Sequence, residues 1–178
     1  MTKPLLCSSK KAEKLLRNYN VRPIVPFNAI PVRKLLPSNA RIYTSCLPRA
    51  IETATRLFPN ADTLPANPVF NEYGLTIVRV PLLPLPYDVW TSLSRVLWVL
   101  HLNQQGETRQ SARSRMKKAS GYLEHMARKD GKVVLVGHGY MIAEMRRELK
   151  RRGWKTVSAQ GNKNLAVTHL VKLGKIEN

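Results

Sequence analysis

A continuous apolar run followed by a helical repeat forms the clearest pair of elements in this chain. Val133–Val136 holds four consecutive apolar residues, as expected of a strand covered on both faces. Directly after it, apolar residues recur at helical spacing at Met141, Ile142, Met145 and Leu149. The pattern therefore predicts a buried strand that leads into a helix with one packed side.

Similar patterns recur along the rest of the chain and predict its fold class. Helices are expected at Lys10–Asn18, Arg49–Phe58, from Asp88 onward and at Glu107–Arg128, and strands at Leu5–Cys7, Arg41–Ser45 and Leu165–Val171. Asp88 is placed to cap the helix that it begins. Strands that alternate with helices predict an α/β domain with a mostly parallel sheet covered on both faces, which is a three-layer α/β/α arrangement. Residues 1–178 are expected to form a single domain, since the length suits one well-filled core.

The charge balance restricts the partners that the protein is expected to bind. The 178 residues include 30 Lys and Arg against 11 Asp and Glu, a formal net charge of +19. Such an excess favours anionic partners, namely phosphorylated molecules, nucleic acid or an acidic membrane surface. Charge alone does not choose among them.

The cysteines and the apolar segments predict a cytoplasmic protein without a membrane span. Cys7 and Cys46 lie far apart without a C-x-x-C spacing, so buried or inert thiols are expected rather than a disulfide framework or a zinc site. The N-terminal apolar stretch is too short for a signal peptide. Gly74–Leu102 is apolar, but charged residues and prolines interrupt it, which argues against a spanning helix.

His138 is the first candidate for a functional residue. It lies between Gly137 and Gly139 at the carboxyl end of the predicted buried strand, where open α/β sheets bind ligands. The glycines permit a tight turn and close approach by a ligand, and the following helix offers free N–H groups to an anion. By contrast, His169 alternates with apolar residues of the last strand, so a buried core position is expected for it.

Arg49 is the second candidate, and it suggests anion binding. The stretch Thr44-Ser-Cys-Leu-Pro-Arg-Ala-Ile-Glu-Thr-Ala54 follows the earlier strand and places Arg49 at the start of a helix. A guanidinium there can bind phosphate through two hydrogen bonds, and the helix N-terminus adds a favourable field.

Together these two motifs resemble the histidine phosphatase superfamily, also called phosphoglycerate mutase-like. In that family a segment like Ser-x-Leu-x-Arg-Ala-x-x-Thr-Ala supplies a phosphate-binding arginine, and a later His-Gly supplies a phosphate-binding histidine. The resemblance implies these roles for Arg49 and His138. It also implies that Glu72, in Phe70-Asn-Glu-Tyr-Gly74, is the acidic residue that donates a proton to the leaving group.

The sequence departs from the family at its nucleophile. The family's first strand ends in Arg-His-Gly, whose histidine attacks phosphorus, and this sequence contains no Arg-His-Gly. The corresponding place is Leu5-Leu-Cys-Ser-Ser9, which makes Cys7 and Ser8 the candidate replacements. Neither has a visible neighbouring base to activate it.

Three functions follow as hypotheses. The favoured one is binding of a phosphorylated small molecule or phosphoprotein in a histidine-phosphatase-like site that is hydrolytically impaired. The first alternative is an active phosphomonoester hydrolase with an unconventional nucleophile, so whether the protein is an enzyme stays open. The second is nucleic-acid or anionic-surface binding through basic helices. No metal or other cofactor is expected in any of them.

Overall fold

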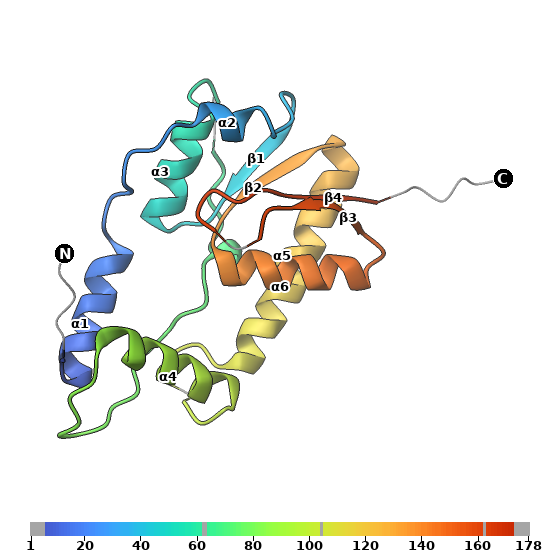
Figure 1. Ribbon diagram of the computed structural model, residues 1–178. Coiled ribbons are helices and arrows are strands. Elements are labelled where there is room, and N and C mark those ends of the chain that lie inside the picture. The colour runs from blue at the N-terminus through green and yellow to red at the C-terminus, as the bar shows by residue number, and fades with distance from the viewer. Residues whose placement is uncertain (1–5, 62–63, 104, 162, 173–178) are drawn as a thin grey trace. The chain divides into compact units, whose positions relative to one another are not determined.

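The computed structural model describes residues 6–61, 64–103, 105–161 and 163–172 (Figure 1). The chain divides into two compact units. The first unit is made of Met1–Arg22 and Tyr73–Ser114, and the second of Pro23–Glu72 and Arg115–Asn178. The single domain expected over residues 1–178 stays a prediction.

The first unit is built on two helices, α1 (Ser9–Asn20) and α4 (Tyr87–Val99). Its buried core contains Cys7, Ala12, Ile77 and Trp90, and Leu16 packs against them. The Trp90 indole is fully buried and its Nε1 donates to the carbonyl of Cys7 at 2.7 Å. In place of the strand expected at Leu5–Cys7, Cys7 forms an isolated bridge with Leu85, while Leu5 lies outside the described residues.

In the second unit, two parallel strands lead into the segments that carry Arg49 and His138. β1 (Arg41–Thr44) pairs with β2 (Val133–Val136), with Arg41 opposite Val133 and Thr44 opposite Val136. Two short helices, α2 (Ile30–Arg33) and the 3-10 turn η1 (Pro68–Phe70), lie in the same unit. Helix α3 (Pro48–Leu57) buries Ala54 and Leu57 in a core shared with Val136.

The remaining elements are α5 (Arg109–Asp130), α6 (Gly139–Arg151), β3 (Lys155–Ala159) and β4 (Thr168–Val171). The helical spacing of apolar residues in α5 predicts one buried stripe, and its members Ala112, Met116 and Ala119 are all buried. Similarly, α6 buries Met141, Met145 and Leu149. Helix α4 begins one residue before Asp88, at Tyr87, so the prediction that Asp88 caps it is wrong.

The described residues confirm a mixed α/β protein with six α-helices, but not the three-layer arrangement. Each of the two sheets contains two strands, and only β1 and β2 pair in parallel. The last strand, β4, pairs antiparallel with β3, which the sequence analysis did not predict. An antiparallel pair needs only a short connection, so β4 can pair with the strand nearest to it in sequence.

The predicted burial of His169 was wrong. His169 is exposed, because it lies on a two-stranded sheet rather than inside a covered parallel one. Of the two thiols, which were expected to be buried or inert, Cys7 is buried and Cys46 is exposed. None of the helices in the described part of the chain is long and apolar enough to cross a membrane.

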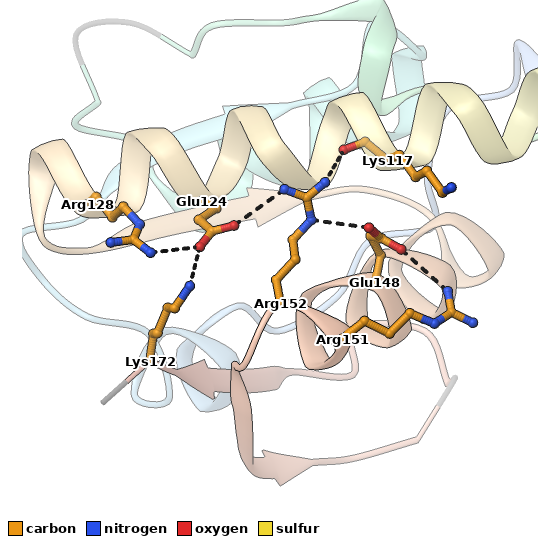
Figure 2. Close-up of polar contacts among 7 residues, drawn as sticks. All are labelled: Lys117, Glu124, Arg128, Glu148, Arg151, Arg152 and Lys172. Atoms are coloured by element: carbon orange, nitrogen blue, oxygen red, sulfur yellow. Dashed lines mark hydrogen bonds and ion pairs between the residues drawn. The ribbon is translucent and has the colours of Figure 1, made fainter. Parts of the chain in front are cut away.

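One carboxylate links three elements of the second unit (Figure 2). Glu124 on α5 forms ion pairs with Lys172 at 2.5 Å, Arg128 at 3.1 Å and Arg152 at 3.5 Å. Lys172 follows β4 and Arg152 follows α6. The Arg152 guanidinium also donates to the carbonyl of Lys117 on α5. A side chain at Gly121 would come within 3.3 Å of that guanidinium, so the glycine leaves room for it.

Candidate anion site

The parallel pairing of β1 and β2 brings two distant parts of the chain to one edge of the sheet. Thr44 and Val136 are opposite each other at the ends of the two strands. The N–H of Ser45 then donates to the carbonyl of Val136 at 3.4 Å, which continues the pairing by one step. Residues 45 onward and 137 onward therefore leave the sheet side by side.

Ser45 and His138 meet at this edge. The Ser45 hydroxyl lies 2.8 Å from His138 Nε2 and is fully buried. It also accepts a hydrogen bond from the N–H of Leu47 at 3.3 Å. His138 itself is the N-cap residue of α6 and is half-buried. The serine hydroxyl thus holds the imidazole in one orientation, as a second polar group does for many functional histidines.

Arg49 lies close enough for its charge to act on His138. Burial lowers the pKa of His138 to about 4, and the positive charge of Arg49 lowers it in the same direction. His138 is therefore neutral near pH 7 in the absence of a ligand. Arg49 occupies the first turn of α3, directly after Pro48, as the sequence analysis predicted.

The lowered pKa of His138 predicts a pH dependence of stability. Because the unfolded chain takes up a proton at the ordinary pKa of 6.5 and the folded chain only near 4, stability is full above pH 6.5 and falls as the pH drops toward 4. In His138→Asn, the free energy of unfolding should fall less between pH 7 and pH 5. Urea denaturation at both pH values measures this, and equal losses in the two proteins would contradict it.

Glu72 reaches the same edge, but its carboxylate is already engaged. Its two oxygens accept hydrogen bonds from the N–H groups of Tyr140 at 3.3 Å and Met141 at 3.2 Å, in the first turn of α6. These are two of the free N–H groups that the sequence analysis expected an anion to use. That expectation is corrected here, because the chain's own carboxylate satisfies both donors.

Of the two glycines beside His138, Gly137 has a packing role that was not predicted, while Gly139 has open space around it. Neither Gly137 nor Gly139 adopts a positive φ, so no left-handed turn requires them. A Cβ at Gly137 would collide with Cε of the buried Met141. Gly137 therefore makes room for the core of the second unit.

A series of hydrogen bonds connects the loop that follows β1 to the segment that carries Glu72. The N–H of Cys46 donates to Oδ1 of Asn71 at 2.8 Å. Arg115 on α5 donates to the carbonyls of Val69 and Asn71 at 3.1 and 2.6 Å. Phe70 is fully buried against Tyr43 of β1 and Tyr122 of α5. These contacts hold the segment that carries Glu72.

The two candidate nucleophiles lie in the first unit. Cys7 is 4% exposed and belongs to the core around Trp90. The Ser8 hydroxyl accepts the N–H of Lys11 at 3.4 Å and caps α1. Both groups therefore have a structural use, and their role as nucleophiles stays a prediction.

Arg49, His138 and Glu72 could be predicted from the sequence, whereas Ser45 and Asn71 were not predicted. Ser45 belongs to the Thr44–Ala54 stretch that contains Arg49, so its position at the end of a strand could be read from the sequence. Its contact with His138 could not, because the register of the two strands was unknown.

In the described residues, no three His, Cys, Asp or Glu side chains gather to hold a metal ion. Comparisons with known protein families, characterised proteins and solved structures found no match to this chain.

Proposed function

We propose that the second unit binds the phosphate group of a phosphorylated small molecule or phosphoprotein between Arg49 and His138, with little or no hydrolysis. The observation that carries the proposal is the convergence of two distant segments. The Ser45 hydroxyl orients His138 at 2.8 Å, and the positive charge of Arg49 acts on the same imidazole. A guanidinium and an oriented ring nitrogen are suitable donors for phosphoryl oxygens.

The electrostatics of the site favour an anion. Arg49 and a protonated His138 would repel each other, and this repulsion contributes to the low pKa of His138. A bound dianion would neutralise both groups and stabilise the protonated imidazole. Binding of an anion should therefore be accompanied by proton uptake and should strengthen as the pH falls.

The side chains that could serve as nucleophile or acid already have structural roles, which supports weak or absent hydrolysis. Hydrolysis by the family's route needs a nucleophile in line with the leaving group and an acid that can donate a proton. Ser45 is fully buried, and Glu72 is held as an acceptor by two backbone N–H groups. Cys7 is buried in the first unit, and no Arg-His-Gly exists in the chain.

The fold that we propose for this function is the three-layer, phosphoglycerate mutase-like arrangement. It is supported by the parallel β1–β2 pair and by the position of both candidate residues at the carboxyl ends of these strands. This edge is where parallel sheets bind ligands.

The proposal is tested by binding and turnover assays on the full-length protein. Titration with sulfate, whose charge does not change between pH 5 and 8, should show binding that tightens at lower pH in the wild type. Ser45→Ala should weaken it several-fold, because the imidazole loses its orientation. Robust hydrolysis of a generic phosphate ester that disappears in His138→Ala would refute the impaired site.

The same assays separate the alternative functions. If hydrolysis is found, a covalent phosphoenzyme mapped to Cys7 or Ser8 would support an active phosphatase with an unconventional nucleophile. If an oligonucleotide binds with steep salt dependence and Arg49→Ala has no effect on it, binding through basic helices would be favoured.

A further inference from the structure

A basic hollow in the first unit shares no residue with the candidate anion site. Its volume is about 360 Å³, and it is lined by Lys10, Glu13, Lys14 and Arg17 of α1 and by Arg79. The four cations and one carboxylate leave an excess of three positive charges around one concave surface.

Packing of α1 against the segment around Arg79 holds the two sides of the hollow together. Ala12 is fully buried, and Ile77, Val78 and Val80 pack in the same core. The Ser9 hydroxyl donates to the carbonyl of Val80 at 3.4 Å. The backbone that carries Arg79 is therefore anchored on both sides to the core that holds α1.

The spacing of the basic residues places them on one face of α1. Lys10, Lys14 and Arg17 are separated by four and three residues, which brings side chains to the same side of a helix. Their face is distinct from the one that buries Ala12 and packs Leu16. The helix thus has one side for the core and one side for charge.

Among the described residues, most of this charge has no carboxylate counterion. Arg17 pairs with Glu13 at 2.9 Å. Across the described residues, Lys10, Lys14 and Arg79 have no ion pair with a carboxylate. Cations that line one hollow repel each other, and an anion bound among them would relieve the repulsion.

We propose that this hollow binds the di- or triphosphate group of a small ligand. Three unpaired cations converging from two segments match a polyphosphate better than a single phosphate, because each can contact a different phosphoryl group. The site shares no residue with Ser45, Arg49 or His138, so it does not depend on the function proposed for the second unit.

The test uses inorganic tripolyphosphate as the probe and the full-length protein in an Arg49→Ala background, so that the candidate anion site contributes little. Isothermal titration at low ionic strength should show one binding event. Replacing both Lys14 and Arg79 by Gln should lower the affinity at least tenfold. Lys11→Gln changes the charge of the same helix outside the hollow, and it should lower the affinity less than twofold.

A third variant tests the direction of the effect. Glu13→Gln removes the single carboxylate of the hollow and releases Arg17, so tripolyphosphate should bind more tightly. Circular dichroism checks that each variant keeps its helices.

Equal losses of tripolyphosphate affinity in Lys11→Gln and Lys14→Gln would overturn the proposal, since they would show that the ligand binds to the overall charge of the helix. Absence of tripolyphosphate binding in the parent protein, or tripolyphosphate binding that is unchanged when Lys14 and Arg79 are both replaced by Gln, would overturn it too.

Discussion

Arg49→Ala is expected to lower the affinity of the protein for inorganic phosphate by about 10- to 100-fold, since hydrogen bonds to a charged group contribute roughly 1.5–3 kcal/mol. The guanidinium would supply two of these bonds at once, and its charge already acts on His138. Isothermal titration at constant ionic strength measures the loss.

A neighbouring arginine on the same helix provides the matched control. Arg56 pairs with Glu52 at 2.9 Å on α3, and Arg56→Ala changes the net charge by the same amount. It should leave phosphate affinity within twofold of the wild type. If both variants lose affinity equally, the overall charge of the protein binds phosphate and the proposed site does not.

Arg49→Ala has a second expected readout that does not involve a ligand. The positive charge of Arg49 helps to lower the pKa of His138, so its removal should raise that pKa toward 6.5. A histidine titration followed by NMR measures the change. An unaltered His138 titration in the variant would show that the two groups are not coupled.

Glu124→Gln is expected to destabilise the protein by roughly 2 kcal/mol at pH 7, because a mostly buried carboxylate is removed from three cations. The Glu124 side chain is 11% exposed, and Lys172, Arg128 and Arg152 all lose their shared partner (Figure 2). Urea denaturation measures the difference. Glu144→Gln, which breaks an exposed pair with Arg147 on α6, should cost less than about 0.5 kcal/mol.

The same residue predicts how the protein responds to acid. Burial acts to raise the pKa of Glu124, but hydrogen bonds from Lys172 and Arg128 outweigh it and hold the pKa at about 2. The unfolded chain titrates near 4.5, so the stabilisation is complete above pH 4.5 and is lost as the pH falls toward 2. Glu124→Gln should lack this part of the acid transition. An unchanged slope between pH 4.5 and pH 2 would contradict the role of Glu124.

The longer helices were predicted well because their buried residues recur at helical spacing, whereas the four-residue α2, which buries no side chain, was not predicted. α5 and α6 occur where the apolar spacing placed them, and Met141 and Met145 of α6 are buried as expected. The strand β3 was missed because four of its five residues are exposed, so no alternation marks it. Its partner β4 shows why His169 was misjudged: alternation indicates a shared face, but not whether another layer covers that face.

By itself, the sequence determined the secondary structure around the candidate site and the presence there of a guanidinium, an imidazole and a carboxylate. Only the tertiary structure decided how these groups are oriented, protonated and hydrogen-bonded. The register that sets Thr44 opposite Val136 brings Ser45 to His138, and burial with Arg49 nearby keeps the imidazole neutral. Packing of the segment after η1 places the Glu72 carboxylate at the first turn of α6, where it accepts two backbone N–H groups. The physical reason is that periodicity depends on neighbours along one element, whereas register, desolvation and charge coupling depend on neighbours from other elements.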